Sequence, residues 1–499
     1  MFPEKLIDIS LCERIFCNRS LNMSSIKAIG FDMDYTLAIY KHETFEKLAY
    51  DETLKKLVKI GYPKDILKWQ FDHKYMLRGL VIDKKLGNIL KMDRHRYVKL
   101  AYHGFKELTR NERRRLYDQE SVVIYEEPDF ALIDTIFALA EAFLFTQLVD
   151  FKENTNELQD KNFAQLHQDV RSCIDLCHRD GSIKNKIAQN PEKYIKEDLC
   201  LINVLEEFRL SGRKLFIVTN SLWDYTNVVM TFLLATGSGV KKNWMDYFDI
   251  IITGAQKPSF FKAKNPLYEV NLESGLLKNS EMLPVISSLS SQDLAAKNAY
   301  PKVFQGGHVK LLHDMLNIQK GSEILYVGDH IYGDILRSKK EIGWRTMLVI
   351  EELEAEINNL FFLKEQYEAC TTLNLKRERL ADELERIQLA LNAKKNGREI
   401  ISEQLKDVSL DEFENQIKKI GYDIVKIREA EGKALSQYHK SFHPVWGELM
   451  KTGRQNSRFS AQVINYSCLY TSKLSNLRHY GANKNFQAVR DFMPHDLDF

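Results

Sequence analysis

The sequence predicts an α/β fold built around a parallel β-sheet, and three observations lead to this prediction. Five short apolar runs alternate with helical or loop stretches, as in a parallel sheet covered by helices on both faces. Four of the runs end on polar residues, which is where open α/β sheets bind ligands. Roughly 180 residues separate the first two runs, far more than the dozen or so that a crossover helix requires. A large domain is therefore inserted after the first strand.

The predicted strands cover residues 26–31, 215–218, 248–252, 324–327 and 347–350. The residues that follow four of them are Asp32 with Asp34, Thr219 with Asn220, Thr253 with Lys257 just beyond, and Gly328 with Asp329. Because parallel strands present their carboxyl ends at one edge of a sheet, we expect these residues to converge on one site.

The spacing of apolar residues divides the chain into three regions. We expect a catalytic core from residues 1–42 and 197–350, and a mainly helical inserted cap from 43–196, with helices at 128–151 and 162–178. Residues 351–443 contain no proline, and leucine and isoleucine recur at steps of four and three between 373 and 391. Region 351–499 is thus predicted to be helical, with a long helix or a helical hairpin that packs on its own domain or on a second subunit.

Composition and charge exclude several classes of protein. The 71 basic and 69 acidic residues give a net charge of +2, so no overall field favours nucleic acid. The N-terminal sequence lacks the features of a signal peptide, and no apolar run approaches the roughly 20 residues that span a bilayer. Seven cysteines, an odd number, indicate free thiols in a reducing compartment. We therefore expect a soluble cytoplasmic protein that binds neither nucleic acid nor membrane.

Cys173 and Cys177 stand four residues apart on a predicted helix, the spacing of a possible metal pair. No second pair of cysteines lies nearby, so buried structural thiols are the favoured interpretation.

The strand ends bring together an unusual number of carboxylates, those of Asp32, Asp34, Asp329 and Asp334. Several carboxylates that face one point cannot all stay ionised without a cation, and hard oxygen ligands select Mg²⁺. The sequence predicts a magnesium site that these four residues form.

The same strand ends carry groups suited to phosphate chemistry. Thr219 and Lys257 can hold phosphoryl oxygens by hydrogen bond and charge. Asp32 is placed to attack phosphorus and form an aspartyl-phosphate. Asp34, two residues further, can protonate the leaving oxygen and then deprotonate the attacking water.

Four motifs in this order resemble those of the haloacid-dehalogenase-like (HAD) hydrolases. They are Asp32-Met33-Asp34-Tyr35-Thr36, Val218-Thr219-Asn220-Ser221, Gln256-Lys257-Pro258, and Gly328-Asp329 through Asp334. The resemblance implies a Rossmann-like parallel core, with Asp32 as nucleophile, Asp34 as acid and base, and the late acids on Mg²⁺. The second acid of the first motif is typical of phosphatases.

Further blocks narrow the resemblance to the cytosolic purine 5′-nucleotidases that prefer IMP and GMP. They include DMDYTLAIYK, GYPKD, RGLVID with GNILKMD, KPSFF, GDHIYGDILRSKK and the closing MPHD, so the likeness covers nearly the whole chain. It implies hydrolysis of purine nucleoside monophosphates, phosphotransfer to nucleosides, activation by a nucleotide such as ATP or GTP, and a homo-oligomer, a tetramer in that family.

The resemblance also implies residue roles at matching positions. It assigns substrate contacts to Phe137, Arg171, Asp175, His178 and Lys184, with Asn220 and Ser221 in the second motif. Phe137 corresponds to an aromatic residue on which the purine stacks, and Lys184 can donate to a 6-oxo group. The sequence departs from the family pattern at Ala138 and Arg179, which stand where the family has an asparagine and an aromatic residue.

A second nucleotide site is implied near the last motif. The matching residues are Phe105, Tyr332, Lys340, Gln462 and Tyr466. Asp134 stands where an asparagine of the family contacts the effector, and an acid near phosphates is unfavourable. Either the identity or the affinity of the effector is therefore expected to differ.

Two other functions remain open at this stage. One is a nucleotide-sensing scaffold that keeps the fold without turnover. The other is a phosphatase of the same superfamily that acts on a different phosphorylated substrate.

Overall fold

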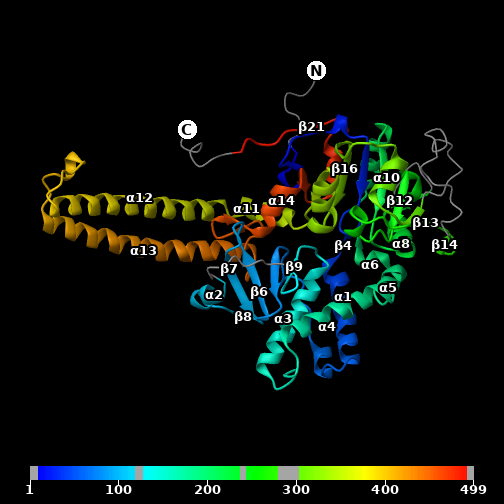
Figure 1. Cartoon of the computed structure of the whole chain (residues 1–499), viewed down its shortest axis with the longest axis horizontal. Coiled ribbons are helices and arrows are strands. Elements are labelled where there is room, and N and C mark those ends of the chain that lie inside the picture. The colour runs from blue at the N-terminus through cyan, green and yellow to red at the C-terminus, as the bar shows by residue number, and fades with distance from the viewer. Residues whose placement is uncertain (1–8, 118–126, 236–242, 279–302, 492–499) are drawn as a thin grey trace. The chain divides into compact units, whose positions relative to one another are not determined.

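The computed structural model describes residues 9–117, 127–235, 243–278 and 303–491. The chain forms two compact units, Met1–Glu354 with Leu449–Phe499, and Ala355–Glu448 (Figure 1). The closing MPHD block at 493–496 lies outside the described residues.

The first unit is built on a ten-stranded sheet. In spatial order its strands are β1 (Phe16–Cys17), β20 (Leu469–Thr471), β17 (Arg345–Val349), β16 (Ile324–Gly328), β3 (Ala28–Phe31), β11 (Lys214–Val218), β12 (Ile250–Thr253), β15 (Val303–Gly306), β13 (Leu267–Val270) and β14 (Leu277–Lys278). Neighbours from β20 to β15 pair in parallel, whereas β1, β13 and β14 pair antiparallel. The predicted α/β class with a parallel sheet is confirmed.

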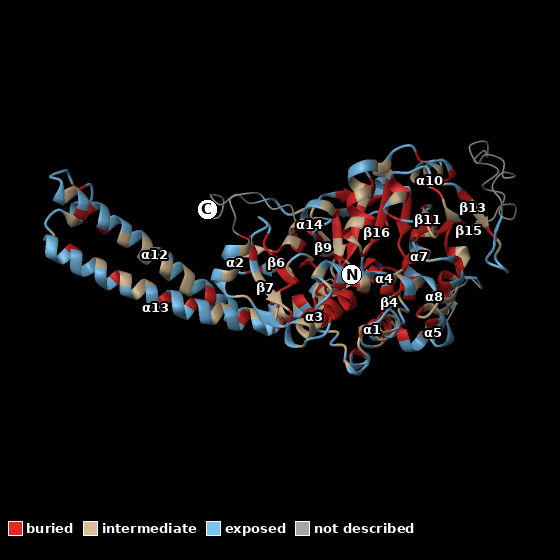
Figure 2. Ribbon diagram, turned by 60° about the horizontal axis from the view of Figure 1, so that its bottom comes forward, coloured by how far each residue is buried: buried red, intermediate tan, exposed pale blue. Residues whose placement is uncertain are grey.

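All five strands predicted from apolar runs are present, and they lie side by side as β17, β16, β3, β11 and β12. Phe31 pairs with Val327 on one side and Ile217 on the other, so the polar residues that follow these strands lie at the same level. The central strands are entirely buried, as Figure 2 shows. This register places the predicted acids at one edge.

Close packing at the centre of the sheet depends on Gly30. A Cβ atom there would lie 2.2 Å from the ring of Phe216 and 2.8 Å from that of Tyr326. Phe216, Tyr326 and Trp344 belong to the buried cluster beneath the sheet, which also takes up Leu312 of α10 (Val309–Leu316). The apolar strands predicted from sequence therefore form the core of this unit.

The first unit also contains elements outside the ten-stranded sheet, and one of them, the 3₁₀ turn at Lys64–Lys68, belongs to the insertion. They are α7 (Leu201–Leu210), α8 (Trp223–Ala235), α14 (Arg458–Tyr466), β2 (Leu21–Asn22), β21 (Asn485–Phe486), β18 (Lys451–Thr452), β19 (Gln455–Asn456), the π-helical turns η9 (Ile331–Leu336) and η10 (Ser338–Ile342), and the 3₁₀ turns η1 (Leu11–Glu13), η2 (Met23–Ser25), η3 (Lys64–Lys68), η4 (Trp244–Tyr247), η5 (Ser259–Phe261), η8 (Gly321–Glu323) and η12 (Leu474–His479). Residues 449–491, expected within the helical C-terminal region, thus return to the first unit and supply strand β20.

The insertion leaves and re-enters the core through a short paired ribbon. Strand β4 (Ile39–Tyr40) pairs with β10 (Ile195–Lys196), so the two ends of the insertion lie together. Its helices are α1 (His42–Lys59), α2 (Arg110–Tyr117), α3 (Ala138–Asn154), α4 (Phe163–Arg179), α5 (Lys184–Gln189) and α6 (Pro191–Tyr194). It also contains an antiparallel sheet in the order β8 (Lys106–Glu107), β7 (Val98–His103), β6 (Asn88–Met92), β5 (Leu80–Asp83) and β9 (Phe130–Ile133).

This second sheet was not predicted. The helix expected over 128–151 begins only at Ala138, because Phe130–Ile133 pairs with β5 as strand β9. The helix expected over 162–178 is present as α4, and a capping box of Asn162 and Gln165 fixes its start. Residues 130–133 form a strand because they pair with β5, a segment distant in the sequence. The spacing of apolar residues along the chain gives no information about such pairing.

The second unit is a helical hairpin, one of the two forms predicted. Helices α12 (Lys364–Lys395) and α13 (Leu410–Phe442) pack along their length, with η11 (Glu403–Leu405) between them, while α11 (Leu353–Phe362) precedes them. Ile387, Leu391, Phe413 and Ile420 are buried along the seam, and Leu380 and Leu384 pack against them. Most of the predicted leucine and isoleucine repeat is therefore the contact between the two helices.

No helix within the described residues combines the length and apolar character needed to cross a bilayer. None of the seven cysteines, all within the described residues, forms a disulfide, and Cys173 and Cys177 are buried in α4.

Candidate active site

Asp32 lies at the carboxyl end of β3. Its backbone N–H donates to the Val327 carbonyl at 2.9 Å and so extends the strand pairing by one residue. Its Oδ1 accepts a hydrogen bond from the Met33 N–H at 2.8 Å. The chain then turns sharply, with the N–H groups of Leu37 and Ala38 both donating to the Met33 carbonyl and Tyr35 at a φ of 53°. This turn directs Asp34 into the same cavity as Asp32.

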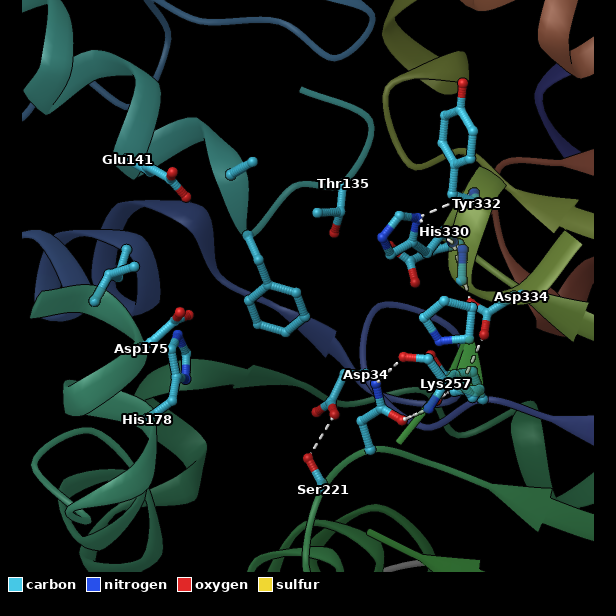
Figure 3. Close-up of a pocket in the computed structure, with 18 of the residues that line it drawn as sticks. Asp34, Thr135, Glu141, Asp175, His178, Ser221, Lys257, His330, Tyr332 and Asp334 are labelled. Atoms are coloured by element: carbon cyan, nitrogen blue, oxygen red, sulfur yellow. Dashed lines mark hydrogen bonds and ion pairs between the residues drawn. The ribbon is translucent and has the colours of Figure 1, made fainter. Parts of the chain in front are cut away.

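Lys257 joins two of the acids. Its Nζ lies 2.8 Å from Asp32 Oδ1 and 2.6 Å from Asp334 Oδ1 (Figure 3), and Tyr326 Oη lies 3.1 Å away. Asn220 fixes the backbone here, because it accepts from the Lys257 N–H at 2.6 Å and donates to the Lys257 carbonyl at 3.1 Å. The ammonium is therefore held between the first and last motifs.

The last motif packs its acids closely against the end of β16. A Cβ atom on Gly328 would lie within 2.5 Å of Asp334 Oδ2, so glycine is needed for Asp334 to approach the strand. Asp334 Oδ2 accepts from the His330 N–H at 3.2 Å, and Ser338 Oγ donates to the Asp334 carbonyl. This part of the motif runs through the π-helical turn η9.

Three carboxylates form a set that can hold a metal ion. Asp32, Asp329 and Asp334 each present an oxygen atom, and these atoms lie within 4.8 Å of one another. Asp329 Oδ2 is buried and has no hydrogen-bond partner in the described structure. Buried hard oxygen donors of this kind suit a divalent cation, so the residues fit the metal that the sequence predicts.

Burial and mutual repulsion shift the acids away from their ordinary pKa. Burial raises the pKa of Asp32 to about 6, although Lys257 opposes the rise. Burial, with repulsion from Asp334 and Asp32, raises the pKa of Asp329 well above its usual value. Burial alone would lower the pKa of Lys257, but Asp32 and Asp334 raise it well above normal, so the ammonium stays charged. The cluster thus favours uptake of further positive charge.

Asp34 is not among the three grouped carboxylates. Its Oδ1 accepts from Tyr40 Oη at 2.5 Å, and its Oδ2 accepts from Ser221 Oγ at 2.8 Å. Burial and the nearby Asp32 raise the pKa of Asp34, whereas the bonds from Tyr40 and Ser221 lower it. A carboxyl group with such opposed influences suits proton transfer. Its predicted place on the metal stays a prediction.

The second motif lies beside the first. Asn220 and Ser221 line the cavity, whereas Thr219 is fully buried and its hydroxyl accepts from the Ser221 N–H at 3.1 Å. Thr219 therefore shapes the turn that carries Ser221. The predicted contact of Thr219 with phosphate stays a prediction.

The acids open into a cavity of about 550 Å³ whose far wall comes from the insertion. The cavity-lining residues of the insertion that the sequence singled out are Phe137, Arg171, Asp175, His178 and Lys184. The fold thus brings these residues to the cavity that Asp32 and Asp34 also line, and Figure 3 labels Asp175, His178 and Asp34 in it.

The aromatic part of this wall is held by edge-on packing. The ring of Phe137 meets Tyr35 at a centroid distance of 4.9 Å and His178 at 5.9 Å. Burial, helped by Lys184 and Arg171, lowers the pKa of His178 to about 4, so its imidazole is neutral near pH 7. The Nζ of Lys184 lies 5.3 Å from the ring centre of Tyr225.

Glu141 was not predicted as a site residue, although it lines the same cavity. This buried carboxylate lies 2.9 Å from Arg171 Nη1 and 3.3 Å from His167 Nε2, while Arg171 Nε lies 3.4 Å from Asp175. Burial opposes ionisation of Glu141, but His167 and Arg171 lower its pKa below normal. An acid within the otherwise apolar run Ala138–Phe145 is the sequence signal that could have identified it.

The five residues of the implied second nucleotide site are only partly gathered. Lys340 Nζ lies 5.1 Å from the ring centre of Tyr466, and Gln462 is buried on the same helix α14. Tyr332 lines the main cavity, and its turn η9 packs against α14. Phe105 instead packs on Tyr75, at 5.2 Å.

Asp134, the acid near that region, is matched by a cation. Arg458 Nη2 donates to its Oδ1 at 2.5 Å, and both side chains are largely buried. Its charge is therefore compensated within the protein.

The chain matches the 5′ nucleotidase family over residues 15–498. It is similar to a 5′-nucleotidase domain-containing protein of Dictyostelium discoideum, with 28% identity over 99% of this chain and 77% of the relative. It is also similar to 5′-nucleotidase domain-containing protein 2 of Rattus norvegicus, with 26% identity over 99% of this chain and 82% of the relative.

Among solved structures, CbbY from Rhodobacter sphaeroides in complex with phosphate has 13% identity and a TM-score of 0.23, over 65% of this chain and 86% of that chain. The family match spans almost the full sequence, including the strand-end motifs and the cavity wall supplied by the insertion. The chain belongs to the 5′ nucleotidase family.

Proposed function

We propose that the protein is a Mg²⁺-dependent 5′-nucleotidase that hydrolyses purine nucleoside monophosphates, chiefly IMP, GMP and their deoxy forms. One observation carries the proposal. Asp32, Asp34, Lys257 and the late acids lie at one end of a cavity whose other wall bears Phe137 and a group of charged side chains from the insertion. Phosphate chemistry at one end and a nucleoside-sized space at the other support a small phosphorylated substrate.

The first chemical step is attack on phosphorus by Asp32. One carboxylate oxygen of Asp32 bonds to phosphorus as the bond between phosphorus and the nucleoside O5′ breaks. Asp34 donates a proton to the leaving O5′. Lys257, 2.8 Å from Asp32, compensates charge on the reacting group. Mg²⁺, held by Asp32, Asp329 and Asp334, supplies further positive charge against the phosphoryl oxygens when it is bound.

In the second step Asp34 takes a proton from water, which attacks phosphorus and releases phosphate from Asp32. A nucleoside hydroxyl in place of water would give phosphotransfer instead. The insertion walls the cavity and limits competing reactions with bulk water.

The base is proposed to bind on the insertion. Phe137 offers a face for stacking, worth about 1–3 kcal/mol for bases on aromatic side chains. Lys184 and Arg171 are donors suited to a 6-oxo purine, and Asp175 is an acceptor for ring N–H groups. This set of donors and acceptors supports IMP and GMP over AMP.

Regulation and assembly are also proposed. The contact of Lys340 with Tyr466, close to Gln462, supports a second site for a purine nucleotide such as ATP or GTP. Exposed apolar side chains on the hairpin, Leu389 at 70% and Ile401 at 99%, support self-association into a homo-oligomer. Free cysteines support a cytoplasmic location.

The test is phosphate release from IMP, GMP, AMP and a phosphopeptide, measured with Mg²⁺ and with EDTA. We expect the wild type to hydrolyse IMP and GMP only with Mg²⁺, and Asp32→Asn to fold normally without turnover. Full turnover by Asp32→Asn would disprove the nucleophile assignment. A wild type inactive on every substrate would support the non-catalytic scaffold, and preference for the phosphopeptide would support a different phosphatase.

A further inference from the structure

Arg78 is a fully buried cation that the proposed chemistry does not use. It belongs to the insertion, two residues before strand β5, and its side chain has 0% exposure. A buried guanidinium is costly unless its donors are satisfied. The groups that accept its hydrogen bonds therefore indicate which parts of the structure Arg78 holds together.

Two of its donors bind one carboxylate of the core. Nε lies 2.8 Å from Glu352 Oε1, and Nη2 lies 2.5 Å from Glu352 Oε2, which is the paired geometry of an arginine–carboxylate fork. Glu352 follows β17, so this contact ties the insertion to the core sheet.

A third donor reaches the acid cluster. Arg78 Nη1 donates to the backbone carbonyl of Asp329 at 3.0 Å, while the guanidinium lies 5.2 Å from the ring centre of Phe459. Gly79, at a φ of 85°, allows this approach, since a Cβ atom there would lie 2.5 Å from Phe459 Cβ. The guanidinium orientation of Arg78 is fixed by its contacts with Glu352, the Phe459 ring and the Asp329 carbonyl.

Glu351, the acid next to Glu352, also pairs with cations but in the described structure is not linked to Asp329 in the same way. Glu351 lies 3.0 Å from His42 Nε2 and also pairs with Lys196, residues near the two ends of the insertion. Glu351 and Glu352 thus both bind cations of the insertion. Of these three cations, Arg78 is the one recorded in contact with Asp329.

We infer that Arg78 is a positioning residue for the metal centre, supplied by the insertion: its fork with Glu352 and its bond to the Asp329 carbonyl fix the backbone that presents the Asp329 carboxylate. The inference rests on the proposed metal site. Groups that orient metal ligands contribute about 10-fold to 100-fold to metal affinity. Lysine cannot replace Arg78, because one ammonium cannot form the fork and also reach the carbonyl.

The test compares Mg²⁺ binding by calorimetry, without nucleotide, in wild type, Arg78→Lys, Glu352→Gln and the matched control Glu351→Gln. We expect Mg²⁺ affinity to fall about 10-fold or more in Arg78→Lys, and less in Glu352→Gln, where the bond to Asp329 remains. Glu351→Gln should lose thermal stability but keep wild-type affinity. At saturating Mg²⁺, Arg78→Lys should keep its KM for IMP.

Wild-type Mg²⁺ affinity in Arg78→Lys would overturn the inference, as would an equal loss in Glu351→Gln, which would indicate a general effect of loosening the insertion. If Arg78→Lys does not fold, unchanged affinity in Glu352→Gln overturns it. A wild type that takes up no Mg²⁺ would overturn the proposed metal dependence itself, so the two failures are distinguishable.

Discussion

Lys257 Nζ lies 2.6 Å from Asp334 Oδ1, and both side chains are almost completely buried. The same nitrogen lies 2.8 Å from Asp32, so one ammonium links the proposed nucleophile to an acid 302 positions further along the sequence. A buried carboxylate pair without this cation would repel strongly. Lys257 therefore compensates the buried acids at this edge of the sheet, and the proposed reaction uses the same ammonium to hold phosphate.

Replacing Lys257 with methionine should reduce stability and turnover together. Removing one partner of a buried ion pair costs about 3–5 kcal/mol, and losing one donor that stabilises a reacting oxyanion costs about 100-fold to 1000-fold in kcat. Urea unfolding and phosphate release from IMP measure the two effects. Lys257→Arg, which keeps the charge, should retain more stability than Lys257→Met. Near wild-type turnover in Lys257→Met would show that the ammonium takes no part in the reaction.

Asp34→Asn should reduce turnover by about 100-fold to 10,000-fold, the range for loss of a general acid and base. The amide keeps the shape of the side chain but carries no transferable proton. Ser221→Ala is the matched comparison, because it removes one 2.8 Å bond to Asp34 and leaves the carboxyl group in place. Steady-state IMP hydrolysis should therefore fall much further in Asp34→Asn. Equal losses in the two variants would mean that Asp34 acts only by position.

The core of the fold could be predicted because its signal is local. Each of the five predicted parallel strands is a short apolar run. Asp32 and Asp329 directly follow β3 and β16, and Lys257 lies four residues after the end of β12. Because parallel strands all end at the same edge of the sheet, the residues that follow them could be predicted to converge even though the strand order was not known.

The sheet of the insertion could not be predicted in the same way. Strand β9 is defined by pairing with β5, nearly 50 residues earlier, and a four-residue strand leaves little periodicity. Arg78 and Glu141 were not predicted as candidate site residues for a related reason. Their roles depend on partners far along the chain, Glu352 and Arg171, that no spacing rule connects.

Glu141→Gln should weaken substrate binding more than it slows chemistry. The change removes the charge that holds Arg171, and this arginine borders the part of the cavity proposed for the base. We expect KM for IMP to rise about 10-fold, the cost of one charge-assisted hydrogen bond, with a smaller change in kcat. Asp169→Asn, on the same helix as Arg171, removes an ion pair with Lys161 at 2.8 Å and should leave KM unchanged. A loss confined to kcat would place Glu141 in the chemistry instead.

His42 should make stability depend on pH in the alkaline range. Burial alone would lower its pKa, but the carboxylates of Glu351 and Glu46, at 3.0 and 2.7 Å, raise it from 6.5 to about 10. A group whose pKa is raised by folding stabilises the folded state fully below its unfolded pKa, and this contribution is lost as pH rises through the folded value. The difference in free energy of unfolding between wild type and His42→Asn should therefore be greatest below pH 6.5 and shrink toward pH 10. Urea unfolding at several pH values measures it, and a difference that stayed constant over this range would show that the imidazole is not held as a cation between the two acids.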